Sequence, residues 1–261
     1  MLLENQVIFL TGGSTGIGLD CAKAYAAEGA KVALVARNGK LAAKAADELE
    51  GDHIGFACDV SKDADVKSAI DRVLSRYGKL DAIHNNAGIA NPSKPLHETT
   101  DDEWDDLFNI NLKSVLHTTR HGLAALRDNK GCILNTSSLV GVIGQEIHAA
   151  YTATKGAMNT LTKSMALDYA KDGIRVNAVC PAGSWTPMLH QWADQQPDPA
   201  GIARYLDEIH PLGYCPDGDV IADACVFLIS SKARFITGHI MHVSGGAEIG
   251  YRRSSVTNPN F

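Results

Sequence analysis

The chain has 261 residues, a length that suits one α/β domain, and 45% hydrophobic with 21% charged residues is the composition of a globular protein. The formal net charge of −6 argues against a groove for nucleic acid, because phosphate contacts need clustered Lys and Arg side chains. No apolar run approaches the ~20 residues of a membrane helix, and no basic leader precedes the first strand pattern. We therefore expect a cytoplasmic protein with neither nucleic-acid nor membrane partners.

Short apolar runs alternate with helical patterns along the chain. Strands are predicted at residues 7–10, 31–36, 54–57, 80–84, 132–135, 174–179 and 240–243, and helices at 16–28, 39–49, 63–77 and 153–171. The strand runs are apolar on both faces, which is typical of a parallel sheet with helices on both sides. Right-handed crossovers then predict an α/β fold with a doubly wound, Rossmann-like sheet, in a single domain over residues 1–261.

Two segments break the periodic pattern. Residues 182–211 mix Pro, Gly, Gln and Asp and are predicted to be mobile, and residues from about 251 to 261 form a polar tail. The six cysteines contain no CxxC pair and lie mostly in apolar runs, which predicts reduced core thiols and no metal site.

A glycine-rich turn joins the first predicted strand to the first helix. Residues 11–18 read Thr-Gly-Gly-Ser-Thr-Gly-Ile-Gly, with the spacing Gly-x3-Gly-x-Gly. Glycines let the backbone approach a pyrophosphate, and the helix N-terminus supplies N–H donors. A glycine-rich turn alone is equally compatible with a structural role, but its place in a βαβ unit favours a dinucleotide cofactor.

The second predicted strand ends in Ala36-Arg37-Asn38, where a carboxylate would accept hydrogen bonds from the adenosine ribose of NAD. Arg37 instead offers a planar donor to a 2′-phosphate, so we expect NADP in preference to NAD. The alternative is that Arg37 is a solvated loop residue. Asp59 follows the third strand and can bond the adenine amine, while small residues end the fourth strand at 85–88.

Tyr151 and Lys155 lie four residues apart and share one face of a helix. A neighbouring ammonium, helped by a positive nicotinamide ring, would lower the pKa of the phenol toward neutral pH and make it a proton-transfer group. The pair by itself is equally compatible with an ordinary surface contact. Ser138 follows a strand at the carboxyl edge of the sheet, where its hydroxyl could hold a substrate oxygen beside that phenol.

These motifs together resemble the classical short-chain dehydrogenase/reductase family over nearly the whole chain. The shared features are Thr-Gly-x3-Gly-x-Gly at 11–18, Asn-Asn-Ala-Gly at 85–88, Asn111, Ser138, and Tyr151 with Lys155. The resemblance implies a seven-stranded sheet, a homotetramer, and Asn111, Ser138, Tyr151 and Lys155 as catalytic residues. It implies that these residues bind the cofactor: Gly12, Ser14, Thr15, Gly16, Ile17, Gly18, Arg37, Asp59, Val60, Asn86, Ala87, Gly88, Tyr151, Lys155, Pro181, Gly183 and Thr186.

The resemblance also implies that Asn111 supports a water linked to Lys155, and that Asn177 faces the nicotinamide. This chain departs from the family pattern after the sixth strand, where Pro181-Ala182-Gly183 stands in place of Pro-Gly. It departs again at His84, where an aliphatic residue is common; we expect a packed histidine with one satisfied nitrogen.

A narrower resemblance, over residues 137–251, is to the branch of L-fucose dehydrogenase and 17β-hydroxysteroid dehydrogenase type 14. It implies that Gln145 lies near the substrate and that the segment Trp185–Pro211, within a lid region of about 182–211, covers it. Trp185 is alternatively a packing anchor, and His148 either lines the mouth of the site or is exposed. We expect hydride transfer between a nicotinamide cofactor and a secondary alcohol or ketone, with an L-fucose-like aldose as substrate. The alternatives are a hydroxysteroid or other hydrophobic alcohol, and a non-catalytic dinucleotide-binding regulator.

Overall fold

Seven parallel strands form the centre of the computed structural model, which describes residues 1–250. In chain order they are β1 (Val7–Thr11), β2 (Lys31–Ala36), β3 (Ile54–Ala57), β4 (Ala82–Asn85), β5 (Cys132–Thr136), β6 (Arg175–Pro181) and β7 (Ile240–Val243). Their order across the sheet is β3-β2-β1-β4-β5-β6-β7. The order reverses between β1 and β4, and at such a point the carboxyl ends of the strands open a crevice for a ligand. The predicted Rossmann-like, doubly wound sheet is confirmed.

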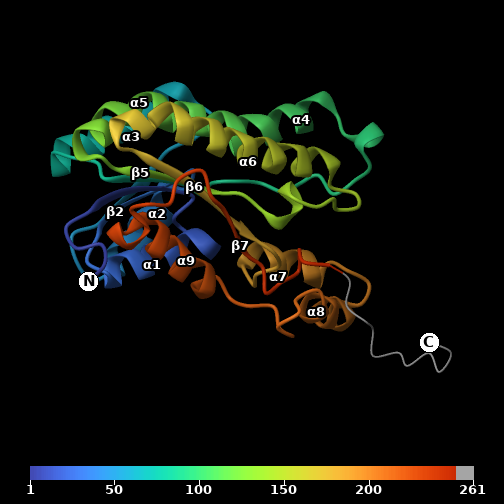
Figure 1. Cartoon of the computed structure of the whole chain (residues 1–261). Coiled ribbons are helices and arrows are strands. Elements are labelled where there is room, and N and C mark those ends of the chain that lie inside the picture. Colours follow the sequence, from blue (N-terminus) through green and yellow to red (C-terminus); the bar gives the residue numbers. More distant parts are fainter. Residues whose placement is uncertain (251–261) are drawn as a thin grey trace.

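Helices cover both faces of the sheet (Figure 1). One layer contains α1 (Gly16–Ala27), α2 (Gly39–Asp47) and α9 (Asp219–Ile229), and the other contains α3 (Asp63–Tyr77), α5 (Ser114–Asn129) and α6 (Ala149–Tyr169). Alternate strand residues enter different layers: Ile8 of β1 packs with α1 and α9, and Phe9 packs with α3. Burial on both faces explains why the strands are continuously apolar in the sequence.

Helix α6 begins at Ala149, four residues before the predicted start at 153. The helical pattern missed the first turn because residues 149–152 lack a marked apolar stripe. The earlier start places Tyr151 in the first turn of α6. On the same side of the sheet, α4 (Asp101–Phe108) runs through a π-helical turn at Asn109–Lys113 into α5.

The segment 182–211 forms two short helices, α7 (Pro187–Asp194) and α8 (Pro199–Glu208). Each has proline at its first position, preceded by a side chain that caps the helix: Thr186 accepts from the Leu189 N–H and Asp198 accepts from the Gly201 N–H. Proline suits the first turn of a helix, where its missing N–H has no partner to lose. The predicted mobility of this segment stays a prediction, and the predicted tail at about 251–261 lies outside the described residues.

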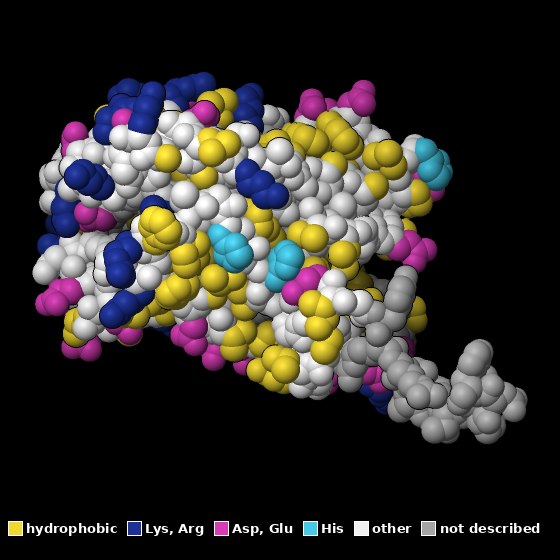
Figure 2. Space-filling model, in the orientation of Figure 1, with side chains coloured by type: hydrophobic (Ala, Val, Ile, Leu, Met, Phe, Trp, Pro, Cys, Tyr) yellow, Lys and Arg dark blue, Asp and Glu magenta, His cyan; other side chains and the backbone are white. Residues whose placement is uncertain are grey.

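Charged and apolar side chains are interspersed on the face drawn in Figure 2, with apolar side chains exposed over α7 and α8. Met188 and Tyr205 of these helices are each 56% exposed. Within residues 1–250, no helix combines the length and apolar character that crossing a membrane requires.

Candidate active site

A cavity of about 580 Å³ opens at the carboxyl edge of the sheet, across the reversal point between β1 and β4. Its volume falls in the range of small-molecule sites. The cavity brings together these residues predicted from the sequence: Gly12, Ser14, Thr15, Gly16, Ile17, Gly18, Arg37, Asp59, Val60, Asn86, Ala87, Gly88, Ser138, Tyr151, Lys155, Pro181 and Thr186.

The glycine-rich turn is tightly packed at two of its positions. Gly12 has a φ of +66°, and a Cβ there would lie 2.9 Å from the Cα of Ala87. A Cβ on Gly18 would collide with the carbonyl oxygen of Gly12. Larger residues would therefore push β1, β4 and α1 apart and close the floor of the cavity.

The N-terminus of α1 faces the cavity, and no acidic side chain in its first turn competes with a ligand for the free N–H groups. The N-cap residue Thr15 makes no side-chain capping bond, and the first turn of α1 carries no acidic residue. The free N–H groups and the positive end of the helix dipole therefore suit a phosphate. Together with the glycines, this arrangement fits the pyrophosphate of a dinucleotide.

Side-chain hydrogen bonds lock the end of β4 to the glycine-rich turn. The hydroxyl oxygen of Thr11 accepts from the backbone N–H groups of Asn86 and Ala87, both at 3.0 Å. The Asn86 amide donates to the carbonyl oxygens of Thr11 and Gly12, at 3.1 and 3.2 Å. The Asn-Asn-Ala-Gly motif thus holds the two halves of the cavity floor in register.

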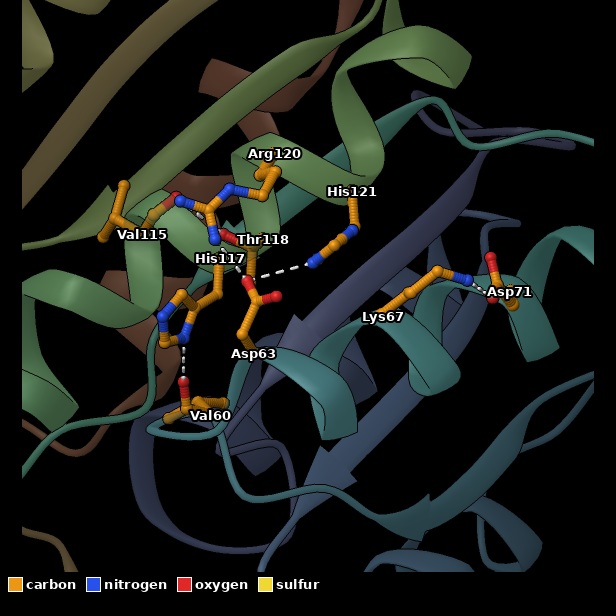
Figure 3. Close-up of polar contacts among 9 residues, drawn as sticks. All are labelled: Val60, Asp63, Lys67, Asp71, Val115, His117, Thr118, Arg120 and His121. Atoms are coloured by element: carbon orange, nitrogen blue, oxygen red, sulfur yellow. Dashed lines mark hydrogen bonds and ion pairs between the residues drawn. The ribbon is translucent and has the colours of Figure 1, made fainter.

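Helix α5 supports the opposite wall of the cavity, where Val60 follows β3 (Figure 3). The Nδ1–H of His117 donates to the Val60 carbonyl oxygen at 3.0 Å. Nearby, the Asp63 carboxylate at the start of α3 accepts from Arg120 at 2.6 Å and contacts His121 at 3.0 Å. These contacts join α3 and α5 and fix the loop that carries Val60.

Asp59 lies beside Val60 as a carboxylate. Partial burial opposes its ionisation, but hydrogen bonds from the Ser61 hydroxyl and N–H dominate and lower the pKa of Asp59. Arg37 lines the cavity next to the N-terminus of α2 and is exposed, so its guanidinium is accessible to a ligand.

Ser138, Tyr151 and Lys155 converge at the other end of the cavity. Tyr151 and Lys155 come from α6, and the Lys155 Nζ lies 5.7 Å from the centre of the Tyr151 ring. Ser138 precedes a short 3-10 turn after β5 and forms a hydrogen bond with Tyr151. Lys155 is 3% exposed, and its ammonium donates to the Thr136 carbonyl oxygen at 2.8 Å.

Burial governs the ionisation of both α6 groups. It raises the pKa of Tyr151, although the hydrogen bond to Ser138 acts in the opposite direction. Burial also lowers the pKa of Lys155 to about 8. In the protein without cofactor the pKa of Tyr151 is therefore above its ordinary value, and the expected lowering by Lys155 together with a positive nicotinamide ring stays a prediction. A positive nicotinamide ring next to Tyr151 would supply the missing charge.

Asn111 lies behind the cavity wall, in the π-helical turn between α4 and α5. Its amide donates to Ile89 O at 2.9 Å and Thr154 Oγ1 at 3.1 Å, and its oxygen accepts from Ile89 N–H at 2.8 Å. A Cβ on Gly88 would be 3.2 Å from this oxygen and 3.7 Å from the Lys155 Nζ. Asn111 and the Lys155 ammonium thus both lie beside Gly88, and π-helical turns such as this one are frequent at functional sites.

Gly183 and Asn177 are not where the sequence placed them. A Cβ on Gly183 would contact Leu206 and Cys215, so this residue faces α8 and the following loop, and Ala182 lines the cavity instead. Asn177 is buried in β6, where its side chain bonds the backbone of Ile236 and His239. Ala182 separates Pro181 from Gly183, and it is Ala182 that takes the place beside Pro181 in the cavity lining.

The three predicted substrate residues do not line the cavity. Gln145 is exposed in the loop before α6. His148 Nε2 is hydrogen-bonded to the Ser93 hydroxyl at 2.8 Å, which joins two loops near the mouth. Trp185 stacks on His190, with ring centres 4.6 Å apart, and therefore packs as an anchor of α7.

Further lining residues were missed by the sequence analysis. Most directly precede or follow the predicted motifs at strand ends, a position that could have identified them, whereas Met188 of α7 carried no signal. They are Val35, Ala36, Asn38, Leu41, Cys58, Ile89, Ala90, Ile110, Thr136, Ser137, Ala182, Pro187 and Met188.

Comparisons with known proteins agree with this geometry. The family model described as enoyl-(acyl carrier protein) reductase matches residues 12–248. L-fucose dehydrogenase of Bos taurus is 37% identical over 250 residues, which cover 96% of this chain and 92% of that protein.

Two solved structures have the same fold. The 3-ketoacyl-(acyl-carrier-protein) reductase of Brucella melitensis, complexed with NADH, has a TM-score of 0.88 and 32% identity and covers 94% of this chain and 99% of its own. Aldohexose dehydrogenase of Thermoplasma acidophilum, in ligand-free form, has a TM-score of 0.88 and 31% identity, with coverage of 97% and 98%.

The fold and the cavity define an oxidoreductase that uses a nicotinamide cofactor and acts on CH–OH groups. The chain belongs to the short-chain dehydrogenase/reductase family.

The buried ammonium yields a prediction about stability. Lys155→Met is expected to raise the free energy of unfolding near pH 7 by on the order of 1–3 kcal/mol, because the desolvated charge disappears while the side-chain length is kept. The pKa of Lys155 is lowered from 10.5 to about 8 in the folded state. The unfolded wild type therefore binds more protons between these values, wild-type stability rises with pH there, and the advantage of the variant shrinks. Urea unfolding on both sides of this window measures the difference.

Lys163→Met, on an exposed position of the same helix, is the control and should change stability little at either pH. A Lys155→Met protein that is less stable than wild type near pH 7 would contradict the prediction.

Proposed function

We propose that Tyr151, Lys155, Ser138 and Asn111 form the catalytic group of an alcohol dehydrogenase whose substrate is a sugar hydroxyl. The observation that carries the proposal is the convergence of Ser138 and the Tyr151–Lys155 pair at one end of a cavity suited to a dinucleotide. When bound, the nicotinamide ring accepts the hydride in oxidation or supplies it in reduction.

Each of the four residues has a separate role in binding the substrate or in transferring its proton. In oxidation, the Tyr151 phenolate takes the proton of the substrate hydroxyl, and in reduction the phenol returns it. Ser138 holds the substrate oxygen within reach of that phenol, as its hydrogen bond to Tyr151 suggests. Lys155 stabilises the phenolate and binds the nicotinamide ribose, and Asn111 supports proton exchange between Lys155 and solvent through the π-helical turn.

Tyr151→Phe tests this mechanism. Removal of the phenolic oxygen should lower turnover by at least ~100-fold, the scale expected for a general acid–base group, while the fold and cofactor affinity persist. Steady-state kinetics measure the first effect, and circular dichroism with cofactor titration measures the others. Turnover near that of the wild type would exclude Tyr151 as the proton-transfer residue.

We propose NADP as the preferred cofactor, with NAD as the alternative. Arg37 lines the cavity beside Asn38, the N-cap of α2, and the guanidinium and the helix N-terminus both favour a 2′-phosphate. The lining at the end of β2 (Val35, Ala36, Arg37 and Asn38) contains no carboxylate to bind the free ribose hydroxyl of NAD.

Arg37→Ala should weaken NADP binding by roughly 1–3 kcal/mol, the range of a charge-assisted hydrogen bond, and leave NAD nearly unchanged. Fluorescence titration of both cofactors gives the comparison, and Lys40→Ala, a nearby exposed cation outside the lining, is the matched control. Equal losses for NADP and NAD would show that Arg37 is a loop residue without a role in cofactor choice.

For the substrate we propose an L-fucose-like aldose. Two similar proteins are an L-fucose dehydrogenase and an aldohexose dehydrogenase, which supports a sugar. A hydroxysteroid or other hydrophobic alcohol is the second candidate, favoured by the apolar lining at Ile89, Ala90 and Met188. A non-catalytic dinucleotide-binding regulator is a remote third, because such proteins typically lose the tyrosine or the lysine.

Assays of aldoses and hydroxysteroids with NAD and NADP separate the three candidates. Oxidation of L-fucose or a related aldose is expected, with Tyr151→Phe as the background. Because Gln145 lies outside the cavity, Gln145→Ala should retain this activity within a few-fold. Activity on hydroxysteroids alone would reject the sugar and keep the mechanism, and no turnover with any substrate would favour the regulator.

We further propose a cytoplasmic homotetramer. Leu116 on α5 and Leu167 on α6 are 50% and 81% exposed, and such apolar side chains suit contacts between copies. Light scattering of the purified protein measures the assembly.

A further inference from the structure

Three buried side chains outside the active site meet in the layer that contains α1 and α9. Cys21 comes from α1, His84 from β4 and Cys225 from α9, and all three are 0% exposed. One ligand atom of each lies within 4.8 Å of the other two. The mechanism proposed above uses none of them.

The geometry of the cluster suits a tetrahedral metal centre. In such a centre, sulfur and nitrogen ligands lie about 2.3 and 2.0 Å from zinc, which puts the ligand atoms roughly 3.5–4 Å from one another. The three ligand atoms therefore need to approach one another by no more than about 1 Å. Rotation of the side chains can supply a movement of this size.

Hydrogen bonds hold His84 at both ring nitrogens. Its Nε2 lies 2.9 Å from the Thr136 hydroxyl oxygen, and its Nδ1 lies 2.9 Å from the Tyr25 hydroxyl. When Nε2–H donates to Thr136, the Nδ1 lone pair accepts from the Tyr25 hydroxyl, so a metal at Nδ1 would replace that hydrogen bond and leave the Tyr25 oxygen beside the ion. Both nitrogens have partners, so the sequence expectation of a single satisfied nitrogen is wrong.

Charge favours a divalent cation at this place. Two thiolates, a neutral imidazole and one divalent cation have zero net charge, which a fully buried site tolerates.

We propose that Cys21, His84 and Cys225 bind one zinc ion, with the Tyr25 hydroxyl as the fourth group. Binding forms two Zn–S bonds and one Zn–N bond, and the two thiol protons leave to solvent with no change of oxidation state. The ion would tie α1 to α9 and to β4, directly below the glycine-rich turn that α1 continues.

The site is connected to the cavity through Thr136. The Thr136 hydroxyl contacts His84, and its carbonyl oxygen accepts from the Lys155 ammonium. Zinc should therefore stabilise the cofactor-binding edge of the sheet as well as the α1–α9 packing. Because the ligands are fully buried, we expect the ion to enter during folding or through local opening, and to exchange slowly.

The test measures metal content in the full-length protein produced with added zinc and dialysed against a chelator. We expect close to one zinc per chain, a higher melting temperature than for the metal-free protein, and tetrahedral thiolate–cobalt absorption bands after replacement by Co²⁺. Cys225→Ala and His84→Gln should lose the metal and the cobalt bands. Cys132→Ala, which removes a buried thiol from the same layer outside the cluster, should keep both.

Two measurements on the wild-type protein, the pH dependence of zinc binding and the mass of the chain, test the proposal even if a variant is unstable. Zinc binding to the wild type should weaken up to ~100-fold for each unit of falling pH, because two protons are released. Zinc content below about one tenth per chain, a pH-independent affinity, or metal retained by Cys225→Ala would overturn the site. A mass two hydrogens lower, from a Cys21–Cys225 disulfide, would overturn it in favour of a redox pair.

Discussion

The buried ammonium of Lys155 is the constraint on which the rest of the site depends. An ammonium removed from water needs a hydrogen-bond acceptor and a nearby anion or π system, and the chain supplies the Thr136 carbonyl oxygen and the Tyr151 ring. These groups come from the end of β5 and the first turn of α6. The strand end, the helix start and the Asn111 turn must therefore keep their relative positions for the lysine to remain inside.

The same requirement explains the polar connections across the sheet. Thr136 contacts Lys155 through its carbonyl group and His84 through its hydroxyl, so it belongs to the active site and to the buried cluster between α1 and α9. Asn86 completes the path, because its side chain bonds Thr136 and the glycine-rich turn. A substitution at any of these positions would therefore alter hydrogen bonds in both the active site and the cluster between α1 and α9.

Local features of the sequence predicted the sheet, the cofactor turn and the Tyr151–Lys155 pair because each depends on neighbouring residues. A strand buried on both faces is continuously apolar, and a helix places residues four apart on one face. The helices α7 and α8 were not predicted because capping side chains and a leading proline specify them rather than an apolar stripe. The first turn of α6 was not predicted because it has no marked apolar stripe, and it has no side-chain cap either. Gln145 lies outside the cavity, and the two alternatives for Trp185 could not be separated from the sequence, because a loop sequence carries no signal for the direction of its side chains.

The sequence by itself determined the fold class, the family and the residues able to carry the chemistry, because these follow from local spacing and short motifs. The tertiary structure alone decided that Tyr151 is buried, which raises its pKa, that Ala182 replaces Gly183 in the cavity, and that Cys21, His84 and Cys225 meet. Each of these outcomes depends on solvent exclusion or on contacts between elements far apart in the chain. The spacing of residues along the sequence contains no information about either.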